Sequence, residues 1–135
     1  GDGFMAVAGL LQTVDDPLGR AVRCGLEMAS TTIDADLGWE VRVGVNAGPV
    51  VAGIVGQERY QFDIWGDTVN VAARMLEKSE PSSVAVTEGV WSQVSSLFEG
   101  EELGALEVKG KGTVSVYGVR ACNSSQVEAA KEEVT

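Results

Sequence analysis

Histidine is absent from this chain of 135 residues, and cysteine occurs only twice, at Cys24 and Cys122. The lack of histidine excludes Ser-His and Cys-His catalytic pairs and every metal site that uses histidine ligands. Two cysteines are too few for a disulfide framework, and we expect a reducing, cytoplasmic compartment.

Basic residues are also scarce, because 10 lysines and arginines stand against 20 acidic residues and give a formal net charge of −10. This balance argues against a nucleic acid partner, which needs a basic surface. A phosphate site in such a chain needs positive charge from metal ions or from a few well-placed side chains. No apolar run approaches the roughly 20 residues that span a bilayer.

Apolar periodicity and turn residues predict one α/β domain with a mixed sheet. Asp16 before Pro17 is a typical helix start, and Asp67 occupies a position suited to capping a second helix. We expect residues 46–49 to form a tight turn between two neighbouring strands. The predicted strands are residues 4–11, 39–47, 50–55, 62–64, 84–87, 106–108 and 114–119, and the predicted helices are residues 18–33, 67–78 and 88–94.

The most informative stretch is residues 62–75, which read FDIWGDTVNVAARM. Asn70 and Arg74 are four residues apart in the predicted helix, so they lie roughly 6 Å from each other on one side. A donor-rich pair near a helix N-terminus, after the acidic Asp63, suits a nucleotide or phosphate. The spacing alone also fits a capped surface helix whose Asn70 and Arg74 face solvent.

Four motifs, in order along the chain, resemble the class III nucleotidyl cyclases, the catalytic domains of adenylyl and guanylyl cyclases. Residues 63–75 are similar to the family's block of an acid, Ile-Trp-Gly and Thr-Val-Asn-x-Ala-x-Arg-Met. The other three are the strand and glycine turn at 41–56, the VKGKG loop at 108–112 and the opening GDGFMA. The resemblance assigns residues 1–121 to the catalytic domain and leaves 122–135 as a polar C-terminal tail.

The resemblance implies a ferredoxin-like βαββαβ core of the α/β (α+β) class. In that family a further strand, helix and strand precede the Gly-Asp motif, so we expect the domain to be incomplete at its N-terminus. The family builds its sites at the interface of a head-to-tail dimer. We therefore expect a homodimer, attached or not to a membrane or sensor domain, and little activity from these 135 residues alone.

The implied activity is the conversion of ATP to 3′,5′-cyclic AMP and pyrophosphate with two divalent cations, Mg²⁺ or Mn²⁺. By the match, Asp2 binds metal, Asp63 accepts a hydrogen bond from the adenine amino group and Asn70 positions the ribose. Arg74 stabilises charge on the transferring phosphate, and Lys109 contacts the terminal phosphates. The nearby Lys111 is a less suitable phosphate ligand, and Asp67 serves as the helix cap.

Two other functions stay open. One is a guanylyl cyclase, which Asp63 disfavours because an ionised carboxylate only accepts hydrogen bonds and would repel the guanine carbonyl. The other is a catalytically silent domain that acts in dimerisation or regulation. The presence of Asp63, Asn70, Arg74 and Lys109 together argues against a silent domain. Locally, Asp2 also fits a simple turn, and Asp63 also fits a bond to a nearby backbone N–H.

Overall fold

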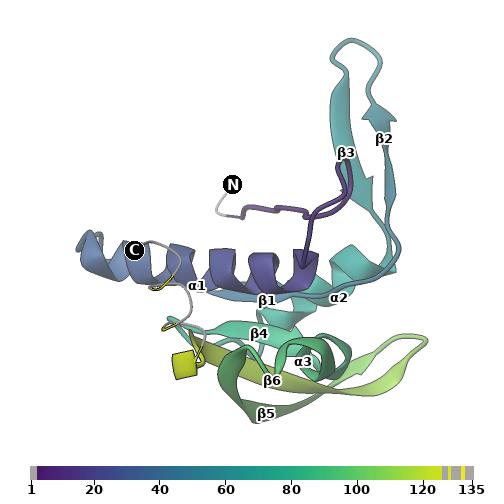
Figure 1. Cartoon of the computed structure of the whole chain (residues 1–135). Helices are drawn as coiled ribbons and strands as arrows, with labels where there is room; N and C mark the ends of the chain where they lie inside the picture. The colour runs from purple at the N-terminus through teal and green to yellow at the C-terminus, as the bar shows by residue number, and fades with distance from the viewer. Residues whose placement is uncertain (1–2, 126–127, 129–131, 133–135) are drawn as a thin grey trace.

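The computed structural model describes residues 3–125, 128 and 132. A four-stranded sheet in the order β1-β4-β6-β5 forms its centre, with β1 parallel to β4 and the other neighbours antiparallel (Figure 1). The expected α/β class with a mixed sheet is thus confirmed. None of the described helices has the length and apolar character needed to cross a membrane. The elements are α1 (Pro17–Asp34), β1 (Val43–Val45), β2 (Val51–Val55), β3 (Gln61–Trp65), α2 (Asp67–Met75), β4 (Val84–Thr87), α3 (Glu88–Val94), β5 (Phe98–Val108) and β6 (Gly112–Cys122).

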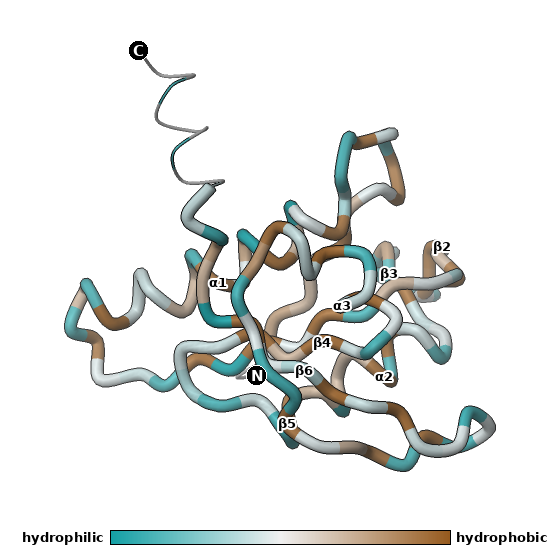
Figure 2. The backbone as a smooth tube through the Cα atoms, turned by 60° about the horizontal axis from the view of Figure 1, so that its bottom comes forward, coloured by the Kyte–Doolittle hydropathy of each residue, from teal (hydrophilic) through white to brown (hydrophobic). Residues whose placement is uncertain are grey.

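Strand β4 lies inside the sheet and is buried along its whole length. Because side chains alternate between the two faces of a strand, Val84 and Val86 join one apolar cluster and Ala85 joins another. The first cluster includes residues of α1 and α3, and the second includes Val71 and Met75 of α2. Figure 2 shows hydrophobic stretches of the chain meeting around β4 and β6. Helices therefore cover both faces of the sheet, with α2 opposite α1 and α3.

Two glycines allow helices to pack closely against the sheet. A Cβ on Gly25 of α1 would lie 2.9 Å from methyl carbons of Val43 and Val84. A Cβ on Gly44 of β1 would lie 2.3 Å from the carbonyl oxygen of Ala72 in α2. Both distances are shorter than a van der Waals contact, so any side chain there would push the helix and the sheet apart.

Residues 4–11 do not form the predicted strand. The segment is irregular, and Phe4 and Leu11 are 80% and 81% exposed. A strand is stabilised through hydrogen bonds to a neighbour, and in the described part of the chain no strand pairs with these residues. The segment instead lines an apolar groove with Phe62 and Ile64 of β3.

The predicted pairing of strands across residues 46–49 is also wrong. Strand β1 pairs with β4, whereas β2 pairs with β3 in a separate hairpin that projects from the body of the molecule (Figure 1). The physical reason is burial: Val43 and Val45 pack against the core of the sheet, whereas Val51 and Ile54 are 55% and 70% exposed. The chain therefore leaves the sheet after β1.

The ends of several elements differ from the prediction. Helix α2 ends at Met75 instead of residue 78, while the strand at 84–87 and the helix at 88–94 have the predicted bounds. Strand β5 begins at Phe98, well before the predicted residue 106. Gly100 and Gly104 lie within β5, at irregularities of its pairing with β6.

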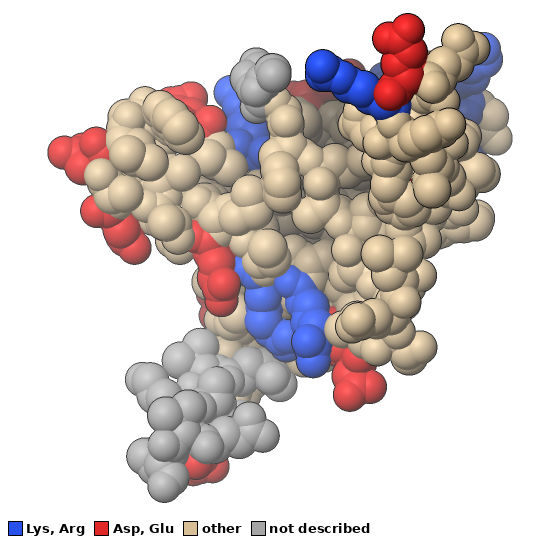
Figure 3. All heavy atoms as spheres, turned by 90° about the horizontal axis from the view of Figure 1, so that it is seen from above, with Lys and Arg blue, Asp and Glu red and all other residues tan. Residues whose placement is uncertain are grey.

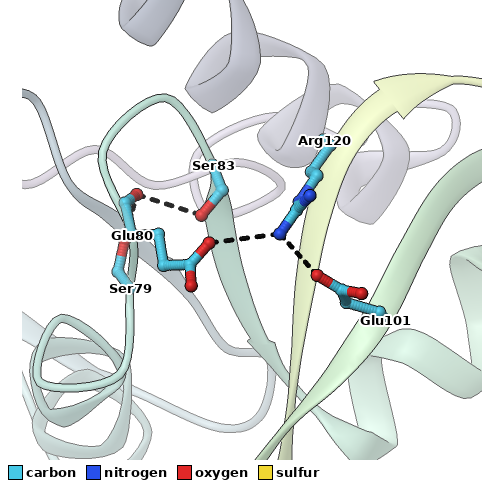
Figure 4. Close-up of polar contacts among 5 residues, drawn as sticks. All are labelled: Ser79, Glu80, Ser83, Glu101 and Arg120. Carbon is cyan, nitrogen blue, oxygen red and sulfur yellow. Dashed lines mark hydrogen bonds and ion pairs between the residues drawn. The ribbon is translucent and has the colours of Figure 1, made fainter.

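The loop between α2 and β4 is fastened by Arg120 of β6. The guanidinium of Arg120 contacts the carboxylates of Glu80 and Glu101, and the Ser83 hydroxyl donates to the Glu80 carbonyl at 3.0 Å (Figure 4). The charged side chains are more than half exposed, at 55–57%. Such pairs stabilise a fold by at most about 1 kcal/mol each. The network therefore sets the position of the loop and adds little to the stability of the domain.

The close approach of α2 to β1 gives a test of the fold. We expect Gly44→Ala to lower the free energy of unfolding by about 1–3 kcal/mol, because its Cβ overlaps the backbone of Ala72. The matched control is Gly89→Ala in α3, where a Cβ meets no atom within 4 Å. The control should leave stability unchanged or raise it by up to about 1 kcal/mol. Denaturant unfolding measures both, and equal stability of the two variants would contradict the packing.

Candidate nucleotide site

Helix α2 begins at the predicted residue, Asp67, but its cap differs from the prediction. Its N-cap is Gly66, which has a φ of 131° that favours glycine, and no side chain caps the helix. Asp67 is the first helical residue, so the assignment of Asp67 as the cap is wrong. The Asp67 Oδ2 atom instead lies 2.9 Å from Lys111 Nζ, in the turn between β5 and β6. The Asp67 carboxylate therefore pairs with a cation on the β5–β6 hairpin and makes no capping hydrogen bond.

Asn46, directly after β1, fixes the N-terminus of α2 to the sheet. Its Nδ2 donates to the Thr68 carbonyl at 3.2 Å, and its Oδ1 accepts from the Thr87 hydroxyl at 3.0 Å. The Thr68 hydroxyl donates to the Pro49 carbonyl at 2.7 Å. Because β1 and β4 are parallel, their carboxyl ends meet, and Asn46 joins both to α2. Our reading of the sequence missed this role, for which the only signal is a polar residue directly after a strand.

Arg74 connects the last turn of α2 to β5. Its Nη1 donates to the Glu107 carbonyl at 2.6 Å, and its Nε lies 3.6 Å from the Glu77 carboxylate. Glu107 is two residues before Lys109, which lies in the turn between β5 and β6. The structure therefore brings Arg74 next to the strand end that leads into the turn of Lys109.

Asn70 lies between these two contacts. Asp67, Asn70 and Arg74 are spaced by three and four residues, so they share one face of α2. Since the outer two contact the β5–β6 hairpin, Asn70 lies on the same side of the helix as that hairpin. Within the part of the chain that the structure describes, the exposed Asn70 side chain has no hydrogen-bond partner.

The other two predicted site residues are not part of this group. Asp63 lies on the projecting hairpin, opposite Gly53 of β2, and is exposed. Its Oδ1 accepts from the Ile64 N–H at 2.8 Å, which is the local backbone bond that the sequence left open as the alternative role of Asp63. Among the described residues, its side chain makes no hydrogen bond or ion pair with Asn70, Arg74 or Lys109. Asp2, the predicted metal ligand, lies outside the described residues.

The described residues do not by themselves fit the two divalent cations that the sequence predicts. Among residues 3–125, 128 and 132, no three Asp, Glu, Cys or His side chains are grouped to hold a metal ion. A pocket of about 260 Å³ lies beside α2, but it is lined by other residues, among them Asn46, Thr87 and Lys111. The four predicted substrate residues, Asp63, Asn70, Arg74 and Lys109, are absent from its lining.

Comparison with known proteins gives consistent matches. Residues 1–121 match the family model described as the adenylate and guanylate cyclase catalytic domain. The chain is 35% identical over 123 residues to the aggregation-specific adenylate cyclase of Dictyostelium discoideum, with 87% of the chain and 8% of that protein covered. It is also 35% identical over 123 residues to an adenylate cyclase of Mycobacterium tuberculosis, with 87% and 27% covered.

One solved structure has the same fold as this chain and a related sequence. It is the guanylate cyclase domain of RhGC from Catenaria anguillulae in complex with GTP. The TM-score is 0.74 and the identity 29%, with 86% of this chain and 66% of that chain covered. The chain thus spans a small part of the length of the two adenylate cyclases and just under two thirds of the solved domain.

The role of Asn46 gives a second test. We expect Asn46→Ala to lower the free energy of unfolding by about 1–3 kcal/mol, because it leaves the buried Thr87 hydroxyl and the Thr68 carbonyl without their partner. The control is Asn123→Ala, whose amide donates to the exposed Ser96 carbonyl at 2.7 Å. Water can replace that bond, so we expect a loss of only about 0.5 kcal/mol. Equal losses in denaturant unfolding would show that Asn46 does not hold α2.

Proposed function

This chain belongs to the class III adenylate and guanylate cyclase catalytic domain family, and we propose that it forms part of an adenylyl cyclase that makes 3′,5′-cyclic AMP from ATP. The observation that carries the proposal is the attachment of α2 to the β5–β6 hairpin, which puts Asn70, Arg74 and Lys109 on neighbouring elements. The chain spans only part of the length of its relatives. We therefore assign the activity to the longest form of the protein in which these 135 residues occur.

In the proposed reaction the ribose 3′-oxygen gives its proton to water and attacks the α-phosphorus. The bond from that phosphorus to the bridging oxygen of the β-phosphate breaks, and pyrophosphate leaves with the electron pair. Asn70 holds the ribose so that the oxygen attacks in line, and Arg74 donates to the phosphate oxygens as charge develops. Lys109 binds the terminal phosphates, which become the leaving group.

The base preference is proposed from Asp63. Its Oδ2 has no hydrogen-bond partner among the described residues and can accept from the exocyclic amino group of adenine, whereas its Oδ1 is held by the Ile64 N–H. The same carboxylate would repel the carbonyl of guanine. The alternative substrate is GTP, since the similar solved domain from Catenaria anguillulae is a guanylate cyclase.

Divalent cations, Mg²⁺ or Mn²⁺, would neutralise the phosphates when bound. Asp2 is the proposed ligand from this chain, with further ligands from outside it. The contribution of the described residues is to bind and orient the nucleotide. The proposed compartment is the cytoplasm, in keeping with two free cysteines.

A second copy of the chain is the proposed partner, in a head-to-tail homodimer. The projecting β2–β3 hairpin supports this, because several of its apolar side chains are exposed, including Ile54 at 70% and Phe62 at 48%. Figure 3, which looks at the molecule from the hairpin side, shows wide areas without acidic or basic side chains. Exposed apolar areas rimmed by charge are typical of protein interfaces.

Activity assays with Mn²⁺ and either ATP or GTP test the function. We expect cyclic AMP as the dominant product, and we expect Arg74→Ala to lower kcat by about 10²–10³ through loss of a preorganised donor. The control is Lys78→Ala, which removes an exposed cation just beyond α2 and should leave kcat unchanged. Cyclic GMP as the main product would overturn the base assignment. A wild-type protein with no cyclase activity would favour the silent domain.

The proposed dimer is tested by sedimentation. We expect the wild-type protein to sediment as a dimer, and Ile54→Asp to shift it to the monomer and reduce activity at the same protein concentration. The control is Leu37→Asp, because Leu37 is 50% exposed but follows α1 and lies outside the hairpin. High activity in a sample that contains only monomer would rule out shared sites.

A further inference from the structure

Two contacts fasten α2 to the β5–β6 hairpin, and Lys109 lies between them. At one end Asp67 pairs with Lys111 at 2.9 Å, and at the other Arg74 donates to the Glu107 carbonyl at 2.6 Å. The helix contacts are seven residues apart, or roughly 10 Å along the axis. The hairpin contacts enclose only residues 108–110. The turn is therefore held at both sides, and the position of Lys109 relative to α2 is fixed.

The ion pair of Asp67 and Lys111 matters little for stability. Their side chains are 54% and 50% exposed, and exposed ion pairs add little to the stability of a fold. Its effect on charge is larger. Lys111 is already neutralised by Asp67, whereas the exposed Lys109 has no carboxylate partner in the described part of the chain. In a chain of net charge −10, an unpaired cation two residues beyond the Arg74–Glu107 contact is suited to an anionic ligand.

We propose that Asp67 and Lys111 are positioning residues, which hold the turn so that Lys109 meets the terminal phosphates of the nucleotide. This inference depends on the proposed function and adds two residues to it. In this role Lys111 acts through the position of Lys109 and does not itself bind phosphate. The two members of the pair must then be equally important, and loss of either has the same effect as loss of both.

A double-mutant cycle tests the proposal in the longest form of the protein that contains this chain. The variants are Asp67→Asn, Lys111→Met and the two combined, with unfolding midpoints to verify that each is folded. We expect each single variant to lower kcat/KM by about tenfold, because small displacements of a binding group are costly. The double variant should lose no more than either single one.

Competitive inhibition supplies a readout that a general loss of structure would not give. Inorganic triphosphate reports on the phosphate site, and the matching nucleoside reports on the base and ribose sites. We expect both single variants to weaken inhibition by triphosphate about tenfold and to leave inhibition by the nucleoside unchanged. The charge swap Asp67→Lys with Lys111→Asp should restore part of the activity. The control, Arg120→Met, breaks exposed ion pairs elsewhere and should match wild type.

Each other outcome counts against the inference. If Lys111→Met is harmful and Asp67→Asn is harmless or beneficial, Lys111 is a phosphate ligand. Additive losses in the double variant would mean that the two residues act separately, and wild-type kinetics in all variants would mean that the pair is only a surface contact. If the wild-type protein makes no cyclic nucleotide, the proposed function itself is wrong and this inference falls with it.

Discussion

The amide of Asn46 joins backbone segments from three parts of the chain: the end of β1, the first turn of α2 and the end of β4. A side-chain amide is well suited to this position because it donates on one side and accepts on the other. The same region contains the Thr68–Pro49 hydrogen bond, so the start of α2 is held by several polar contacts in a part-buried setting. The face of α2 that carries Asn70 and Arg74 is set by this anchor together with the close approach at Gly44.

Local patterns predicted the local structure well. The strand at 84–87 and the helix at 88–94 have the predicted bounds, and Asp16 caps α1 by accepting from the Gly19 N–H at 3.0 Å. The pairing of strands was harder to predict. A tight turn after residue 45 looked like a hairpin, yet β1 pairs with a strand almost forty residues later. The partner of β1 depends on which strands bury their side chains between the helices. The local sequence carries little information about that burial.

The candidate site was predictable only in its motif residues. Spacing placed Asn70 and Arg74 on one side of a helix, and the resemblance added Asp63 and Lys109. The contacts that orient them were not predictable in the same way. The Asp67–Lys111 pair and the Arg74–Glu107 hydrogen bond each join residues more than thirty positions apart. Asp67 also satisfied a local rule for helix caps, which Gly66 and a long-range ion pair override.

The parallel pairing of β1 with β4 has a consequence for how the domain folds. Residues 46–83 form a closed loop between the two strands, and this loop contains the β2–β3 hairpin and α2. Closing a loop of this length costs conformational entropy before the hydrogen bonds between the strands can form. Topologies with many such contacts between distant residues fold slowly for this reason. Asp63, Asn70 and Arg74 all lie within the loop. Their arrangement therefore depends on closure of this loop by the pairing of β1 with β4.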